Sequence, residues 1–445
     1  MEGLNHGDTA WMAMSCALVL FMTPGLAFFY GGLVRDSNII NTMMMSIISM
    51  GLTTLTWMVL GFTWAFDSAI WPYNVAHGWT YVGFRNLQDK VWPGTTMPGL
   101  TFAVFQMTFA IIGAAIISGA VVERIRFSAY AIFIVVWVLA VYVPLCSWIW
   151  GGGWIAEMGA KDFAGGTVVH ISSGTSAMAL ACLLGERKHR VESFPSNLPF
   201  VILGGGILWL GWTGFNGGSA FAANGDCALA IATTYIAAAA AMVMWITIER
   251  ILEGAPTSVG AMSGAVAGLV NITPCAGYVE PLGALGVGAL GAACCYFASK
   301  VLKKLDLVDD SLDCFALHGV GGFCGAILGG FFDVQDGLIY SGENLLLLRN
   351  LGGAAFGVVY SAAVTAIIFF VMRIAMRMRV SEEQELEGVD LHCHSEVAYG
   401  KKEHSGRPMG FGEHSQRYKP QAPTLLTGTS AGTAEPKPRI EEATV

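Results

Sequence analysis

The chain has 445 residues, of which 54% are hydrophobic and only 13% are charged. Soluble domains carry roughly a quarter charged residues, so this composition excludes an ordinary water-soluble protein. The net charge of −8 comes without a basic stripe interleaved with aromatic residues, and we therefore expect no nucleic-acid partner.

The apolar residues lie in long blocks, and a block of about 20 apolar residues has the length of a bilayer-spanning helix. The first block follows an N-terminus without the basic lead of a cleaved signal, so we interpret it as a spanning helix. Eleven blocks occur, at about residues 10–33, 40–66, 98–122, 128–150, 164–184, 199–218, 227–248, 257–275, 281–299, 312–332 and 350–376. The sequence thus predicts an all-α membrane protein with eleven transmembrane helices.

The basic residues of the connecting loops predict the orientation, because Lys and Arg favour the cytoplasmic side. With the N-terminus outside, the inner loops hold ten such residues: Arg35, Arg124, Arg126, Arg187, Lys188, Arg190, Arg250, Lys300, Lys303 and Lys304. The outer loops hold four: Arg85, Lys90, Lys161 and Arg349. An odd number of spans then places the C-terminus inside, after a transmembrane domain of residues 1–378.

Glycines at helical spacing mark close packing between predicted helices. Gly260, Gly264 and Gly268 are spaced by four, and such a stripe lets another helix approach closely. Tight packing alone explains this pattern, although a narrow pore requires it too. The ten cysteines lie mostly in apolar blocks, which favours buried thiols over a disulfide framework. Cys227 and Cys275 fall near the outer face, where a pairing stays open.

Two histidines lie inside apolar blocks, His170 in the fifth span and His318 in the tenth. Because five spans per half is an odd number, the second half is inverted relative to the first, which places a transport site between the halves. A lone buried histidine is normally a core residue, but ionisable residues inside a bilayer are costly and usually functional. Asp162 begins the helix of His170, where a carboxylate caps backbone N–H groups.

Aromatic residues near the outer ends of the spans are candidates for contacts with a small cation. Phe105 and Phe109 share a helix face, Phe215 and Ser219 share another, and Trp150 precedes three glycines. Such residues more often serve packing or the membrane interface. Their chemistry nevertheless suits a cation, because ring faces attract it and a hydroxyl accepts hydrogen bonds from N–H donors.

Five strings carry a family resemblance: FYGGLVR, ERIRFSA, DFAGGTVVH, GFNGGSA and LHGVGGFCGAI. They resemble the ammonium transporter (Amt/Mep/Rh) family, nearest its Amt branch, and the resemblance covers the chain from Trp11 to about Tyr399. It implies an N-out, C-in plasma-membrane protein of eleven helices, assembled as a homotrimer with one pore per subunit. The tail string EEQELEGVD is similar to the regulatory C-terminal segment of the family.

Matched position by position, the resemblance implies an outer ammonium site. Phe109, Trp150 and Ser219 are its expected ligands, with Phe105 beside them. Asp162 is similar to the acidic residue that supports this site from behind. Ammonium and methylammonium are the expected substrates.

The same comparison implies a gate and a proton-handling pair in the pore. Phe109 and Phe215 resemble the stacked rings that close the outer mouth, and His170 and His318 resemble the paired pore histidines. The chain departs from the family pattern in the string ISSG after His170, which is more polar than usual, and at Ser395, where glycine is common.

The resemblance predicts a mechanism in which ammonium is gathered outside, loses its proton, and crosses as ammonia past the histidines. Two other functions stay open: an ammonium sensor that signals through its tail, and an Rh-like gas channel for ammonia or carbon dioxide. We expect neither an enzyme nor a cofactor, because no nucleophile–base pair or metal cluster stands outside the pore. The tail pattern His392, Cys393, His394 offers too few ligands for a metal site.

The C-terminal region divides into two predicted parts. Residues 379–400 are expected to form a cytoplasmic regulatory segment, a docking site for a PII-type signal protein or a kinase. Residues 401–445 are rich in Gly, Pro, Ser, Thr and charge, which predicts disorder.

Overall fold

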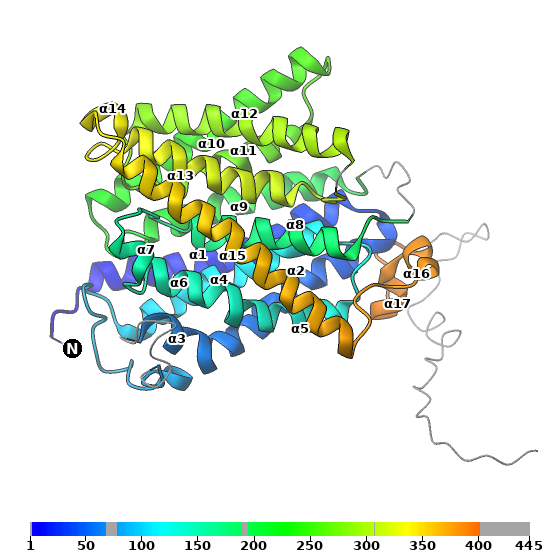
Figure 1. Ribbon diagram of the computed structural model, residues 1–445, viewed down its shortest axis with the longest axis horizontal. Helices are drawn as coiled ribbons and strands as arrows, with labels where there is room; N and C mark the ends of the chain where they lie inside the picture. Colours follow the sequence, from blue (N-terminus) through cyan, green and yellow to red (C-terminus); the bar gives the residue numbers. More distant parts are fainter. Residues whose placement is uncertain (1, 68–77, 189–194, 307, 401–445) are drawn as a thin grey trace, which may run out of the picture. The chain divides into compact units, whose positions relative to one another are not determined.

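The computed structural model describes residues 2–67, 78–188, 195–306 and 308–400, and the predicted disordered tail of residues 401–445 lies outside the described residues. Residues 1–399 form one compact unit, described here by itself. Within the described residues the regular structure is helical (Figure 1). The predicted all-α class is therefore confirmed.

The described residues contain ten helical segments that are long and apolar enough to cross a membrane, together with the shorter apolar helix α11. In chain order they are α1 (His6–Leu33); α2 (Ile39–Thr56) continued by η2 (Trp57–Gly61) and α3 (Phe62–Phe66); α4 (Gly99–Ile116) with η4 (Ile117–Ala120); α5 (Phe127–Trp137), η5 (Val138–Tyr142) and α6 (Val143–Ile149); η6 (Gly166–Ile171) with α8 (Ser172–Leu184); α9 (Leu198–Gly218); α10 (Gly225–Leu252); α11 (Ser258–Ile272); α12 (Pro281–Leu305); η7 (Phe315–Val320) with α13 (Gly321–Phe332); and α15 (Leu345–Ala375).

Short helices occupy the connections: η1 (Asp36–Asn38), η3 (Val82–Phe84), α7 (Trp154–Glu157), α14 (Leu338–Ser341), α16 (Glu382–Glu387) and α17 (Val389–His394). Several spans reach beyond the predicted blocks because polar caps extend them. Asn5 accepts hydrogen bonds from the backbone of Gly7 and Asp8, so α1 begins at His6 rather than near residue 10. Asn224 caps α10 in the same way.

Small residues let the helices approach one another at backbone distance. The helices α10, α11 and α12 lie side by side (Figure 1), and a Cβ added at Gly268 of α11 would lie 2.5 Å from the carbonyl oxygen of Ala237. A Cβ at Gly264 would lie 2.6 Å from the Cβ of Trp245. The predicted glycine stripe thus serves helix packing. Cys227 and Cys275 are both free, buried thiols, so they do not pair.

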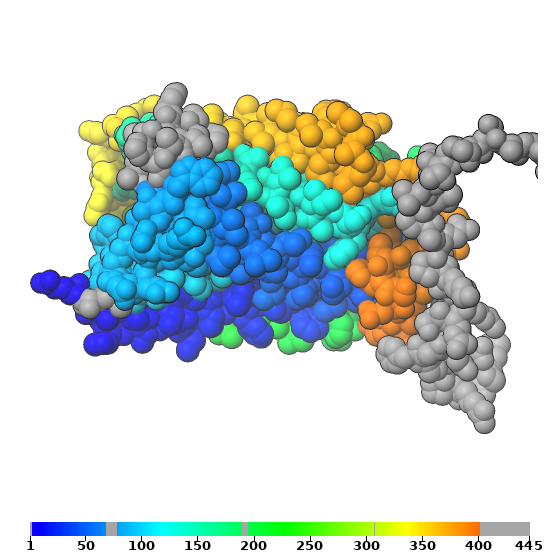
Figure 2. Space-filling view, turned by 90° about the horizontal axis from the view of Figure 1, so that it is seen from below, coloured from blue at the N-terminus to red at the C-terminus, as the bar shows by residue number. Residues whose placement is uncertain are grey.

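The first part of the tail, residues 379–399, packs against the inner loops of the same unit. In Figure 2 this segment (orange) lies beside the first helices (blue). Asp390 accepts hydrogen bonds from the backbone of Ile40 and Asn41 at the start of α2, at 3.0 and 2.8 Å. Ser395, which ends α17, has a φ of 57°, a left-handed conformation that explains why glycine suits this position.

Candidate functional site

A cavity of about 540 Å³ opens at the outer end of the helices. Its wall combines aromatic rings with a few polar groups: Phe66, Phe102, Gln106, Ile149, Trp150, Asp162, Phe163, Ser219, Ala220, Phe221, Asp226, Gly277, Tyr278 and Gln335. Three of the predicted outer-site residues, Trp150, Asp162 and Ser219, therefore share one cavity. We call this cavity the outer vestibule.

Trp150 and Ser219 are each fixed by a hydrogen bond to a backbone carbonyl. The Trp150 indole Nε1 donates to the carbonyl oxygen of Asp162 at 2.9 Å, which sets the orientation of the ring. The Ser219 hydroxyl donates to the carbonyl oxygen of Phe215 at 2.8 Å. Because the hydroxyl proton is committed, the lone pairs of the Ser219 oxygen stay available to accept a hydrogen bond inside the vestibule.

Asp162 acts as the cap of the helix that carries His170. Its Oδ1 accepts hydrogen bonds from the backbone N–H groups of Gly165 and Gly166, at 2.9 and 2.6 Å. Its Oδ2 accepts from Thr167 and Val168, at 2.8 and 3.1 Å. The carboxylate thereby satisfies the N–H groups that the first turn leaves without partners. Asp162 thus lies in the vestibule wall with both carboxylate oxygens occupied by the backbone.

Two phenylalanine rings, tilted by 33° to each other, lie between Trp150 of the outer vestibule and His170. The rings of Phe109 and Phe215 lie 4.2 Å apart between centroids, and both side chains are buried. Phe109 also meets the edge of Trp150 at 5.9 Å. Neither Phe105 nor Phe109 lines the vestibule: Phe109 lies directly behind Trp150, and Phe105 lies against Phe109 and Phe221.

Beyond these rings lie His170 and His318, which meet edge to edge through their Nδ1 atoms. Their Nδ1 atoms are 3.2 Å apart, and their rings are nearly parallel, inclined by 21°. The ring of His170 also stacks on Trp212 and Phe215, with centroids at 5.5 and 5.8 Å. Phe109, Phe215, His170 and His318 thus form one continuous row of rings inward from the vestibule.

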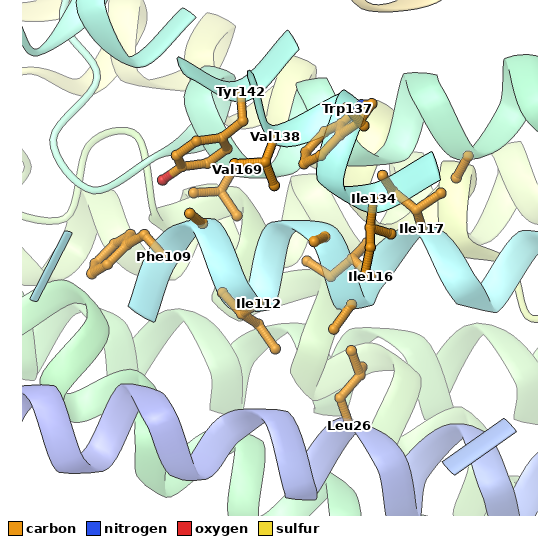
Figure 3. Close-up of a cluster of buried hydrophobic side chains, with 14 of the residues drawn as sticks. Leu26, Phe109, Ile112, Ile116, Ile117, Ile134, Trp137, Val138, Tyr142 and Val169 are labelled. Atoms are coloured by element: carbon orange, nitrogen blue, oxygen red, sulfur yellow. The ribbon is translucent and has the colours of Figure 1, made fainter. Parts of the chain in front are cut away.

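The space beside the histidines is narrow and apolar. A cavity of about 10 Å³ is lined by Met22, Leu26, Phe29, Ile112, Ile116, His170, Leu208, Trp212, Val266 and His318. In Figure 3, Ile112 of α4 and Leu26 of α1 project into the space between these two helices. The volume corresponds to roughly one water-sized molecule. The Nε2 atom of His170 has no hydrogen-bond partner in the described part of the chain.

The two histidines lie on matching elements of the two halves. Each is carried by a π-helical turn, η6 or η7, and each follows a capping carboxylate by eight residues. Asp310 accepts hydrogen bonds from the backbone of Cys314 and Phe315, as Asp162 does at the outer end. Burial and the nearby charge of Asp313 raise the pKa of Asp310 to about 7. The inverted relation predicted from the histidines thus extends to their caps.

Glycines allow the two histidine-bearing segments to cross closely enough for this contact. A Cβ added at Gly174 of α8 would lie 2.2 Å from the backbone nitrogen of Gly319, next to His318. A Cβ at Gly322 would lie 2.6 Å from the carbonyl oxygen of Gly166, at the start of η6. Larger residues at either position would push the two segments apart.

Four polar residues of the vestibule were not predicted from the sequence: Gln106, Asp226, Tyr278 and Gln335. Gln106 is buried, lines the vestibule, and leaves its Oε1 without a partner among the described residues. Its position in an otherwise apolar block, between Phe105 and Phe109, was an available signal. Asp226 and Tyr278 come from loop and helix ends, where polar residues are common and carry no such signal.

A network of charged side chains lies on the cytoplasmic side, below η7. The Nε and Nη2 groups of Arg187 donate hydrogen bonds to the Asp309 carboxylate at 2.8 and 2.9 Å. Arg124 forms an ion pair with the same carboxylate at 3.4 Å. Glu123 pairs with the same Arg187 and with Arg35. Burial alone would raise the pKa of Asp309, but the arginines hold it at about 2. The pKa of Glu123 is lowered for the same reason, Arg187 opposing the effect of burial.

A helical bundle of eleven spans, with an aromatic vestibule that leads to a narrow apolar passage, defines a membrane transport protein. Comparisons with known proteins identify the family of transport proteins. The profile of the Ammonium Transporter Family matches residues 10–399. The ammonium transporter of Bacillus subtilis is 43% identical over 407 residues, which cover 89% of this chain and 99% of that relative.

Solved structures agree with the sequence comparison. The crystal structure of Saccharomyces cerevisiae Mep2 matches with a TM-score of 0.80 at 30% identity, covering 86% of this chain and 89% of that one. A structure named Sensor Amt Protein matches with a TM-score of 0.79 at 28% identity, covering 87% and 98%. The chain belongs to the ammonium transporter family. It is a multi-pass protein of the plasma membrane that transports ammonium.

Proposed function

We propose that the chain recruits ammonium in the outer vestibule, removes its proton, and passes ammonia along the paired histidines with transfer of charge. The observation that carries this proposal is the 3.2 Å contact between His170 and His318 beside an apolar space of molecular size. A transporter of a bare cation would need polar ligands along this space, and its described wall is almost wholly hydrocarbon.

Recruitment rests on Trp150, Ser219 and Phe109. The indole ring offers its face to a cation, an attraction of about 0.5–2 kcal/mol. The free lone pairs of Ser219 and the unpartnered Oε1 of Gln106 supply acceptors for the N–H groups. Phe105 serves this site by packing behind Phe109 and Phe221. Asp162 keeps the wall in shape and adds a negative charge behind it.

Ammonium must lose its proton because of the apolar space behind the rings of Phe109 and Phe215. Phe109 and Phe215 must separate for any molecule to pass, and the space beyond them offers a cation almost no ligands. Moving an unpaired ion into such a space costs far more than moving neutral ammonia. The proton therefore leaves the substrate at the rings, where it passes to His170, which stacks on Phe215, and ammonia enters the passage alone.

The histidines provide a route for that proton. An Nδ1–Nδ1 contact of 3.2 Å needs one proton between the two rings, so one ring donates and the other accepts. The unpartnered Nε2 of His170 stands ready to exchange a proton with the substrate. A proton that moves along the pair while ammonia moves beside it carries charge without a bare cation.

The test is electrical. The full-length protein is reconstituted into a bilayer that contains no other transporter, and current is recorded with and without ammonium. We expect inward current that requires ammonium and saturates with its concentration. Ammonia flux without current would contradict charge transfer, while leaving the transport of ammonium itself intact.

A sensor function is the second candidate, because one structural relative is named Sensor Amt Protein. A sensor that moves little substrate would bind ammonium without sustained current. An Rh-like gas channel would conduct ammonia or carbon dioxide without saturation by ammonium. The cation-binding chemistry of Trp150 and Ser219 favours the transporter over the gas channel.

We further propose that the chain acts as a homotrimer and that residues 379–400 regulate it. Val389 donates to the side-chain oxygen of Asn38, whose amide donates to Glu123, at 2.8 and 2.7 Å. Glu123 pairs with Arg187, which pairs with Asp309, next to the cap of the His318 helix. A PII-type signal protein or a kinase that displaced the tail would act on this continuous set of contacts.

A further inference from the structure

A second cavity lies at the cytoplasmic end of α15, separate from the ammonium path. It has a volume of about 630 Å³ and is lined by Leu183, Leu184, Phe369, Arg373, Ile374, Ala375, Met376, Arg377, Met378 and Arg379. Apolar side chains and three arginines thus share one wall. Neither the gate, the histidines nor the outer vestibule contributes to it.

The cavity lies at the depth of the lipid head groups. The 31 residues of α15 span about 46 Å at 1.5 Å per residue, whereas the hydrocarbon core measures about 30 Å. The last turn, with Arg373, therefore leaves the hydrocarbon on the inner side. Ile374 beside it is 89% exposed and Phe370 is 52% exposed, so this flank of α15 faces lipid.

Two of the three arginines form no ion pair in the described part of the chain. Arg379 donates to the carbonyl oxygen of Leu184 at 3.0 Å and pairs with Glu385 at 2.7 Å. Arg373 and Arg377 are exposed and form no ion pair with any residue in the described part of the chain. Two unpaired guanidinium groups beside an apolar wall complement a ligand that is anionic at one end and apolar at the other.

We propose that this cavity binds an anionic phospholipid of the inner leaflet. Its phosphate lies between Arg373 and Arg377, because guanidinium groups bind phosphate through paired hydrogen bonds. An acyl chain follows Leu183, Phe369 and Ile374 into the hydrocarbon. A free phosphate would use the arginines but not the apolar wall.

The bound lipid also touches the start of the tail segment. Met376 and Met378 form part of the cavity wall, and the carbonyl oxygen of Met378 accepts a hydrogen bond from the backbone of Arg126 at 2.9 Å. Occupancy therefore stabilises the strand-like stretch that leads from α15 to the docked helices. This inference concerns binding and stands independently of the proposed transport mechanism.

The experiment uses full-length protein in phosphatidylcholine vesicles that contain a trace of phosphatidylglycerol with a photoactivatable acyl chain. After illumination, the labelled residues are mapped by mass spectrometry. We expect label on Leu183, Phe369 or Ile374, and a loss of the order of tenfold in the double variant R373Q/R377Q. The lysine variant R373K/R377K should label between the wild type and R373Q/R377Q, because it keeps the charge but loses the paired hydrogen bonds of the guanidinium groups.

Controls separate this site from general lipid contact. The variant R349Q, at the outer end of α15, should label as the wild type does. Phosphatidylcholine with the same photoactivatable chain should label the cavity weakly and without regard to the arginines. Equal labelling by the two lipids, unchanged labelling in R373Q/R377Q, or label confined to other helices would overturn the proposal. Displacement by inorganic phosphate at constant ionic strength would assign the site to a free anion instead.

Discussion

His170 and His318 meet through their Nδ1 atoms, 3.2 Å apart, so the two rings cannot both carry a proton on the facing nitrogen. Whichever ring donates fixes the tautomer of the other. In the ring whose Nδ1 lacks a proton, the proton is bound to Nε2, the outer nitrogen, which lies beside the passage. The geometry therefore couples the protonation of the two outer nitrogens, which is what a proton relay requires.

Replacing either histidine by alanine should abolish the ammonium-evoked current. His170→Ala removes the ring whose Nε2 is free, and His318→Ala removes its partner, so each breaks the relay. Ammonia can still leak through, because the apolar passage stays open. Current and ion selectivity are measured together in both variants, with His6→Ala, an exposed residue outside the pore, as the control. Wild-type, ammonium-selective current in either variant would rule out the relay, and potassium current would assign a selectivity role.

Replacing Trp150 by leucine should weaken apparent affinity more than maximal rate. The lost ring contact is worth about 0.5–2 kcal/mol, which corresponds to roughly a 2- to 30-fold rise in half-saturation. Methylammonium should compete at the same site, since it keeps the charge and most N–H donors. Trp154→Leu is the matched control, because Trp154 packs on Phe356 and does not line the vestibule. Unchanged half-saturation in Trp150→Leu would argue against this assignment.

The spans and the two histidines could be predicted because each rests on a strong contrast between polar and apolar residues. His170 and His318 are conspicuous in apolar blocks, and the structure brings them into contact. The vestibule was harder to predict because its wall comes from several loops. Lys161 illustrates this: its Nζ pairs with Asp333 and Asp336 and lies 4.9 Å above the ring of Tyr278.

Neither the cap at Asp310 nor the tail helices were predicted, and the reasons for the two differ. Asp310 repeats the spacing of Asp162 to its histidine, but the sequence around it shows little likeness between the halves. The helix α16 depends on Ser381 and Gln384, which cap each other reciprocally, and on Glu385, which is buried against Arg379. Such contacts between distant segments do not follow from local propensity.

Removing the tail segment should lower transport while leaving the assembly intact. A chain cut after Met378 loses Arg379, which donates to the carbonyl oxygen of Leu184, and Asp390, which accepts from the backbone at the start of α2. A chain cut after Tyr399 keeps these contacts and serves as the matched control. Uptake of labelled methylammonium and the oligomeric mass in detergent are measured for both. Normal uptake in both truncated chains would exclude regulation by the tail within the protein.

Replacing Asp309 by asparagine should destabilise the protein and reduce its sensitivity to acid. Asp309 neutralises Arg187 and the fully buried Arg124, and loss of one partner of a buried ion pair costs several kcal/mol. In the folded protein the pKa of Asp309 is about 2, below the usual value of 3.8, so its contribution is present above pH 4 and is lost as the pH falls toward 2. That contribution amounts to about 2 kcal/mol.

The measurement is the melting temperature in detergent between pH 7 and pH 2. At pH 7 we expect Asp309→Asn to melt a few degrees below the wild type. Between pH 4 and pH 2 the melting temperature of the variant should fall less, because the titrating carboxyl is gone, although Glu123 still contributes through its own lowered pKa. Asp89→Asn, an exposed carboxyl of the outer loop, is the control and should follow the wild type at every pH. A variant that melts with the wild type at pH 7, or keeps the full acid sensitivity, would show that Arg124 and Arg187 do not depend on Asp309 for their neutralisation.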